Sequence, residues 1–305
     1  MSVVASTMRR LPRRQDRSPL LAKPFYLAPA YFVLVVFFLL PALATIGISF
    51  TDWNLGQRDF SFVGLDNYVA LFNSGDFHTS IRNTLLLNLF VVPASFVVSL
   101  LLALAITSVT RWAAFWQTLY FIPVTSNLVA MAVVWDYLLH PELGFVAQLS
   151  LAAGFGPVNW LNDRDYVLYT VGFISMWQLL GYYTVLFMAG LLNIPDTLYE
   201  AARVDGAASP WDRFWHVTWP MLGPTSLFVF VITVIKSFQI FDVVKVLTEG
   251  GPDKASEIIL HTLYQEGFVF FRMGAAASIA TVFFFVMLLL TVYQMRIFER
   301  SVHYG

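Results

Sequence analysis

The sequence lacks cysteine and has few charged residues. Only 12% of its 305 residues are Asp, Glu, Lys or Arg, whereas a soluble domain carries about a quarter. The absence of cysteine excludes disulfide frameworks and thiolate metal sites. The formal net charge of −1 argues against a nucleic-acid-binding protein, because such proteins need a basic face. With 58% apolar residues, the chain has too few charges to cover a fully aqueous surface.

Long apolar stretches make up most of the chain. The apolar core of a bilayer is about 30 Å thick and needs roughly 20 apolar residues of helix. Stretches of this length are expected to be helical, because lipid offers no partner to unpaired backbone groups. They are residues 25–50, 83–107, 117–139, 166–192, 221–247 and 273–297. The sequence therefore predicts an all-α integral membrane protein with about six transmembrane helices.

Lys and Arg residues are unevenly distributed around these stretches. Six of them lie in segment 1–24. Together with the loops and tail expected on the same side, that side holds 11, and the opposite side holds 4. Cytoplasmic loops carry the excess of positive charge. We therefore expect the basic segment 1–24 and the tail 298–305 to be cytoplasmic.

A secretory signal is an alternative reading of the N-terminus. It would combine the basic segment with a cleavage site at Ala42-Leu43-Ala44. The apolar run, however, is about twice as long as the apolar region of a signal peptide. The length favours a retained first transmembrane helix.

Segment 193–220, between the fourth and fifth stretches, shows the pattern of two short helices around a turn. Asp196 can cap the first helix, and Gly206 is suited to ending it because glycine tolerates a positive φ. Ser209 can cap the second helix, and Asp212 three residues later completes an acidic variant of the capping box. Such a pair predicts a docking surface for another protein; a plain connecting loop is the alternative.

This segment also resembles the EAA motif of bacterial ABC importer permeases. The resemblance rests on Glu200-Ala201-Ala202, on Gly206 after three intervening residues, and on Val217-Thr-Trp-Pro220. More narrowly, the chain resembles the maltose and glycerol-3-phosphate class of carbohydrate permeases. Further motifs of that class occur in the expected order, at 62–68, 159–161, 247–252 and 270–274. The chain departs from the pattern by one extra residue between Gly206 and Val217, and by Trp219 in place of the usual leucine.

The resemblance implies a type I ABC importer permease in a bacterial or archaeal cytoplasmic membrane. It implies as partners a second related permease, two cytoplasmic ATPase subunits and an extracytoplasmic solute-binding protein. The sequence has no Gly-Lys pair and hence no P-loop, so ATP and Mg are expected on the ATPase. No cofactor or metal is expected on this chain.

The resemblance also implies residue roles in the segment around Glu200, which forms the coupling helix in this family. Glu200 would contact the ATPase, the two alanines would allow close packing, and Pro220 would begin the fifth span. The expected coupling residues are Glu200, Ala201, Ala202, Asp205, Gly206 and Pro220.

Polar residues inside the fourth and fifth spans are candidates for a solute path, because burying them in lipid is costly. The candidates are Trp177, Gln178, Tyr182, Tyr183, Lys236, Ser237, Phe238, Gln239 and Asp242. The resemblance places solute contacts near Phe238 and Gln239. Helix–helix contact and interfacial anchoring are alternatives for each of them. Lys236 could face an anionic solute such as a phosphate ester or pair with another subunit.

Two other classes of membrane protein compete with the importer. An ion-coupled secondary transporter often shows inverted repeats, which are not evident here. A cytoplasmic loop that docks another protein also has no role in its mechanism. A membrane enzyme needs clustered histidines and carboxylates, yet the histidines are scattered through loops and tail: His78, His140, His216, His261 and His303. The sequence therefore predicts a permease subunit of an ATP-driven, binding-protein-dependent importer. A sugar or sugar-like solute is expected, with glycerol-3-phosphate among the candidates.

Overall fold

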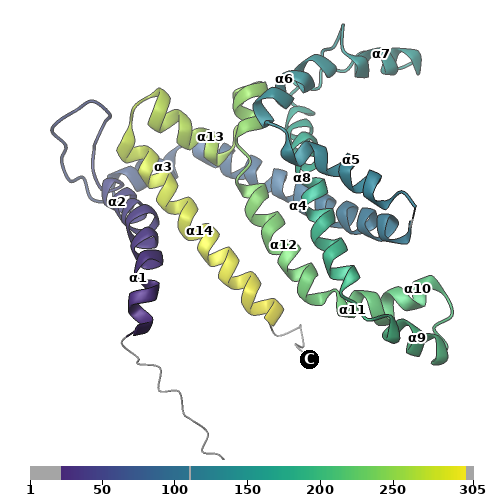
Figure 1. The fold of residues 1–305 in the computed structure, drawn as a ribbon. Coiled ribbons are helices and arrows are strands. Elements are labelled where there is room, and N and C mark those ends of the chain that lie inside the picture. Colours follow the sequence, from purple (N-terminus) through teal and green to yellow (C-terminus); the bar gives the residue numbers. More distant parts are fainter. Residues whose placement is uncertain (1–21, 110, 300–305) are drawn as a thin grey trace, which may run out of the picture. The chain divides into compact units, whose positions relative to one another are not determined.

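The computed structural model describes residues 22–109 and 111–299. Figure 1 shows the helices that they form. Of the residues that the structure describes, 75% are helical. Within the described ranges there is no β-strand, and one isolated bridge joins Thr51 to Phe62. The fold is all-α, as the sequence predicts. The expected cytoplasmic segments, 1–24 and 298–305, lie almost entirely outside the described residues.

The described residues before Ile48 form a unit of their own. It consists of helix α1 (Ala22–Leu34), the π-helical turn η1 (Val35–Leu39) and helix α2 (Leu40–Ile48). Pro41 has no N–H to continue the backbone ladder, and the helix widens into the π turn directly before it. Within this unit and the residue after it, Leu27–Ile48 are long and apolar enough to cross a membrane.

Four helices form most of the second unit, which begins at Ile48. They are α4 (Gly75–Ser108), α8 (Val167–Leu192), α12 (Gly223–Phe238) and α14 (Met273–Glu299). Helix α4 begins eight residues before the span expected at 83–107, because Ser74 caps it and accepts a hydrogen bond from the Phe77 N–H.

Apolar clusters show the directions of these helices. The first halves of α4 and α8 pack together, as do their second halves, so the two helices run parallel. The first cluster contains Leu87 and Val91 of α4 with Leu168, Val171 and Ile174 of α8. The second contains Leu100, Ala103 and Ile106 of α4 with Tyr183, Phe187 and Met188 of α8. Helix α12 runs the opposite way, because Val229 joins the second cluster whereas Val234 and Phe238 pack on Val92.

Two glycines allow close helix packing. A Cβ atom at Gly181 of α8 would collide with the carbonyl group of Tyr120 in α5 (Ala113–Thr125). A Cβ at Gly190 would lie 2.6 Å from the Thr225 hydroxyl oxygen of α12. Small residues are used in this way where membrane helices approach closely. These contacts hold α8 against both α5 and α12.

The third expected span, 117–139, is not one straight helix. Helices α5 and α6 (Leu128–Leu138) meet at an angle of 101°. Asn127 causes the break, since its side-chain oxygen accepts hydrogen bonds from the N–H groups of Val129 and Ala130 and starts a new helix. A hydropathy window cannot show this, because the capping residue is a single polar position in an apolar run.

The fifth expected span, 221–247, is also interrupted at both ends. Helix α12 begins only at Gly223 and ends at Phe238, and a π-helical turn, η3 (Val244–Thr248), follows. The segment Pro210–Met221 joins α12 with a bend of 70°. Pro220 therefore lies before the bend and does not begin α12, contrary to the role expected for it. By length and composition, the described residues contain four helices able to cross a membrane, or up to six if each bent pair is one span.

Short helices cap the end of the bundle where α4 and α14 begin. They are α3 (Asp66–Asn73), α13 (Ile259–Tyr264) and the π turn η4 (Gln265–Val269), while α7 (Phe145–Ala152) follows α6. Two of the family-like motifs meet here. Asn67 donates hydrogen bonds to the carbonyl oxygens of Ser49 and Thr51, and a Cβ at Gly274 would collide with that same Thr51 oxygen. We refer to this end as the α13 end. The opposite end, where helix α9 (Asp196–Val204) follows α8, is the α9 end.

Candidate functional site

Segment 193–220, for which the sequence predicts a docking surface, forms two helices at the α9 end, as Figure 1 shows. We call it the docking segment and its helices the docking helices. The first is α9 (Asp196–Val204). Pro195, and not Asp196, occupies the N-cap position, so the predicted cap was one residue late. Asp196 stands in the first turn and Arg203 in the last, where each charge complements the helix dipole.

Gly206 ends α9 as the sequence predicts. Its φ is +98°, in the left-handed region that glycine adopts without a Cβ clash. The Gly206 N–H donates to the Arg203 carbonyl at 3.3 Å, and the Ala207 N–H donates to the Ala202 carbonyl at 2.8 Å. This pair of bonds is a Schellman motif, which satisfies the last carbonyl groups of the helix.

The second helix starts with the predicted capping box. It comprises α10 (Pro210–Arg213), the π turn η2 (Phe214–Thr218) and α11 (Trp219–Met221). The Ser209 hydroxyl accepts a hydrogen bond from the Asp212 N–H at 3.0 Å, and the Asp212 carboxylate accepts from the Ser209 N–H and hydroxyl. These bonds hold the pKa of the Asp212 carboxyl below its usual value.

A groove of about 710 Å³ lies between the two docking helices. Both apolar and acidic side chains line it. Its lining residues are Leu198, Ala201, Ala202, Asp205, Gly206, Ala207, Asp212, His216, Val217, Pro220 and Met221. The alanines and the glycine keep it open. The Tyr199 hydroxyl, 3.0 Å from that of Thr218, joins the two helices beside it.

The groove brings together five of the six expected coupling residues. Only Glu200 is not among the residues that line it, and its side chain is exposed on α9. Sequence reasoning missed Val204, an apolar side chain that is 87% exposed at the last position of α9. The sequence could have indicated it, because Val204 is an apolar residue between two charged residues, Arg203 and Asp205. An apolar residue this exposed is suited to burial against another protein.

The expected solute-path residues are divided between buried and exposed positions. Tyr183 is 2% exposed within the second apolar cluster, and Phe238 is 9% exposed against Val92. Lys236, Gln239 and Asp242 are exposed around the end of α12. Within the described ranges, neither charged residue of this group forms an ion pair. Their role in solute contact stays a prediction.

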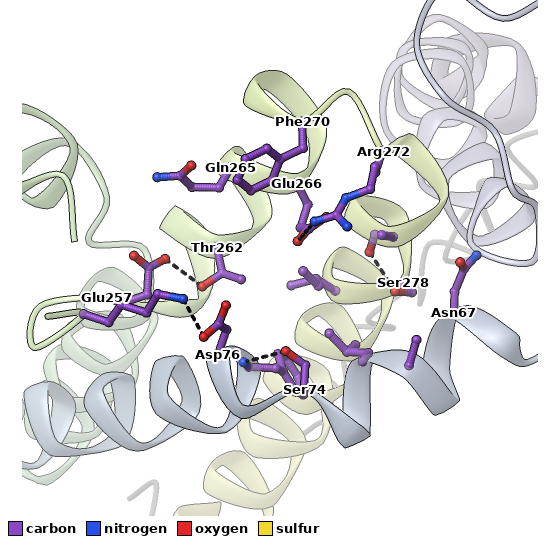
Figure 2. A pocket seen from close by; sticks show the side chains of 16 residues that line it. Asn67, Ser74, Asp76, Glu257, Thr262, Gln265, Glu266, Phe270, Arg272 and Ser278 are labelled. Atoms are coloured by element: carbon purple, nitrogen blue, oxygen red, sulfur yellow. Dashed lines mark hydrogen bonds and ion pairs between the residues drawn. The ribbon is translucent and has the colours of Figure 1, made fainter. Parts of the chain in front are cut away.

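The smaller groove, of about 460 Å³, lies at the α13 end (Figure 2). Figure 2 shows side chains from α3, α4, α13, η4 and α14 around it. Two ion pairs contribute to its wall: the Lys254 ammonium contacts the Asp76 carboxylate, and the Arg272 guanidinium lies 2.7 Å from the Glu266 carboxylate. The second oxygen of Glu266 is buried, with no hydrogen-bond partner among the described residues.

His261 lies in a helix, not in a loop or the tail as the sequence suggested for the histidines. It is fully buried in α13, and its Nδ1 lies 2.9 Å from the Glu257 carboxylate. Thr262 donates to the other Glu257 oxygen at 2.8 Å. Asn83 of α4 fixes this segment by donating to the carbonyl oxygens of Lys254 and Glu257. In the part of the chain that the structure describes, no group of three or more His, Asp or Glu residues has the arrangement of a metal site.

Comparison with known proteins gives a family match over nearly the whole chain. A family described as "Binding-protein-dependent transport system inner membrane component" matches residues 25–304. The chain is 34% identical over 278 residues to the probable ABC transporter permease protein YurN of Bacillus subtilis, covering 90% of this chain and 94% of that protein. It is 32% identical to the sn-glycerol-3-phosphate transport system permease protein UgpA of Escherichia coli O157:H7, covering 91% and 94%.

A solved structure with a similar fold is a bacterial ABC transporter involved in the import of the acidic polysaccharide alginate. The match has a TM-score of 0.81 and 23% sequence identity, and it covers 93% of this chain and 98% of that one. At this identity the likeness establishes the fold alone.

Proposed function

Because the chain belongs to the family of binding-protein-dependent transport system inner membrane components, we propose that it forms part of the path for a sugar or sugar-like solute in an ATP-driven importer. The chain is a multi-pass membrane permease of this family. UgpA is named for glycerol-3-phosphate, and the structural neighbour is described as importing alginate. Both names support a carbohydrate or its anionic derivative as the solute.

The proposal includes a set of partners and an orientation. A separate subunit would bind ATP and Mg and hydrolyse ATP, since the sequence has no P-loop. A second permease, two ATPase subunits and an extracytoplasmic solute-binding protein would complete the importer. The Lys and Arg distribution supports cytoplasmic termini, with the α9 end inside and the α13 end outside.

The open groove between α9 and α10 is the observation that carries the coupling role. Small side chains, Ala201, Ala202 and Ala207, line it, and the apolar side chain of Val204 on the same helix α9 is exposed. The groove is joined directly to a membrane helix, because Leu222, which is fully buried, follows α11 and precedes α12. We infer that an ATPase subunit docked on this face moves α12 and so alternates access to the solute path.

Substitutions in the groove test this role. Ala202→Asp should abolish solute uptake, because it adds a charge without a partner to a surface that has to pack closely on another protein. Gly206→Val should reduce uptake by distorting the turn, while Gly206→Asn should retain most of it because asparagine tolerates the left-handed region. The measurements are solute uptake and recovery of the ATPase subunit on the tagged permease.

Membrane insertion of each variant, checked by fractionation, is the control. Normal assembly and normal uptake by both Ala202→Asp and Gly206→Val would reduce the segment to a connector. Uptake that continues without any ATPase subunit would instead support an ion-coupled transporter, for which the comparisons provide no support.

A further inference from the structure

Three tryptophans lie along one side of the helix that follows Ser209. Trp211, Trp215 and Trp219 are four residues apart and are 67%, 45% and 36% exposed. Their rings form a continuous row, with centroids 5.6 Å apart between Trp211 and Trp215 and 6.2 Å apart between Trp215 and Trp219. Phe214 packs edge-on against Trp215, with a centroid separation of 5.2 Å. We call Trp211, Trp215 and Trp219 the tryptophan row.

The other sides of this helix are already occupied. Val217 and Thr218 are buried against the second apolar cluster and Tyr199. Asp212 and His216 line the groove beside α9. The tryptophan row is therefore a third face, separate from both the core and the groove, and none of its residues lines that groove. The chain itself leaves these large apolar rings uncovered.

The bend before α12 determines how this helix is placed in the membrane. The segment Pro210–Met221 makes an angle of 70° with Gly223–Phe238. Membrane-crossing helices are tilted by about 20° on average from the bilayer normal. If α12 crosses with such a tilt, the segment that precedes it runs close to the plane of the membrane surface. The row then lies at the depth where α12 enters the bilayer.

We propose that the tryptophan row is a membrane-surface anchor, which places its rings in the interfacial region of the leaflet on the α9 side. Tryptophan is enriched at membrane interfaces because its ring is apolar while its N–H can bond to water or headgroups. The row is continuous through Leu222 with α12, the helix that would enter the bilayer. The acidic Asp212 is turned away from the row into the groove, so no carboxylate on this helix opposes an anionic headgroup.

The anchor assigns different partners to two faces of one helix. The row contacts lipid, while the groove beside α9 stays free for a protein. Lipid contact along α10–α11 holds the groove at a fixed height relative to the bilayer surface. The inference depends on α12 crossing the membrane, but not on the identity of the solute or on the docking of an ATPase.

The absence of cysteine from the sequence makes a direct test simple. Trp211→Cys and Trp215→Cys each give a unique thiol for a nitroxide label, and His216→Cys gives a matched control on the groove face. The full chain is reconstituted in vesicles of phosphatidylethanolamine and phosphatidylglycerol. Collision of the label with oxygen, which concentrates in lipid, is compared with collision with a water-soluble nickel chelate.

Labels at 211 and 215 should collide more with oxygen than with nickel, and the label at 216 should show the reverse. Adding the ATPase subunit should leave 211 and 215 unchanged. Nickel access at 211 and 215 equal to that at 216 would overturn the anchor. Shielding of 211 and 215 that appears only with the ATPase subunit would also overturn it, by assigning the row to a protein interface.

Discussion

Gly250, in the loop after η3, lies against the buried Glu257–His261 pair. Gly250→Ala therefore tests how closely this loop packs on the pair at the α13 end. The φ of Gly250 is +84°, and a Cβ there would collide with the Glu257 carboxylate and lie 3.1 Å from His261 Nδ1. The left-handed conformation costs a residue with a Cβ about 1–2 kcal/mol. Displacing the carboxylate from its partners adds about 1–3 kcal/mol for a buried group left unsatisfied. We expect a total loss of about 2–5 kcal/mol.

Gly56→Ala is the matched control. Gly56 has a similar φ of +92°, but no atom lies within 4 Å of its added Cβ, so only the backbone cost applies. The free energy of unfolding of the full chain in detergent, from denaturant titration, should fall further for Gly250→Ala by about 1–3 kcal/mol. In a Glu257→Ala background the difference between the two glycine substitutions should shrink, because the colliding carboxylate is gone and only the 3.1 Å contact with His261 Nδ1 remains at Gly250. Equal losses in the wild-type background would refute the reasoning.

Two further predictions concern ion pairs and a helix cap. Arg272→Ala should lower the free energy of unfolding by about 1–3 kcal/mol, because it leaves the Glu266 carboxylate, whose side chain is only 19% exposed, without a partner. Lys254→Ala should lower it by less than about 1 kcal/mol, because the side chains of Lys254 and Asp76 are 52% and 61% exposed. The same denaturant titration checks both, and equal costs would contradict the burial argument. Ser209→Ala should cost about 1 kcal/mol and speed amide exchange across 209–213. Hydrogen bonds from Ser209 lower the pKa of Asp212 below its ordinary value of 3.8. The capping box should therefore be intact at pH values above 3.8 and should weaken as the pH falls below 3.8 and the Asp212 carboxylate is protonated. This acid-dependent change in exchange should be absent from Ser209→Ala.

The docking segment shows which features a sequence can predict. The turn at Gly206 and the capping box at Ser209 follow from interactions within a few residues, and both appear in the structure. The first cap was misplaced by one residue because Pro195 already has the extended conformation that an N-cap requires. Local rules identify the residues of such a turn more reliably than its boundary.

Features that depend on distant contacts were not predictable in this way. His261 and Glu257 are four residues apart, a spacing visible in the sequence, but their burial depends on Asn83, 174 residues away from Glu257 along the chain. The interruption of the fifth span between Phe238 and Asp242 was equally hidden, because its residues are apolar enough on average to continue a span. Hydropathy averages over a window, whereas a break is set by a few backbone hydrogen bonds.

Helix α12 connects the two ends of the bundle, and its two ends are held differently. Beyond η3, the chain is fixed to α4, since Asn83 donates to two of its carbonyl groups and the Thr84 hydroxyl accepts from the Ile259 N–H at 3.0 Å. At the other end, α12 continues through Leu222 into the docking helix. If α12 tilts at the docking helix, the backbone must therefore bend somewhere between α12 and the segment that is bonded to α4. The interruption after Phe238 is where the helical ladder is already broken, and Gln239 is exposed there. Motion at one end of the permease would thus be converted into bending beside the polar residues predicted for the solute path.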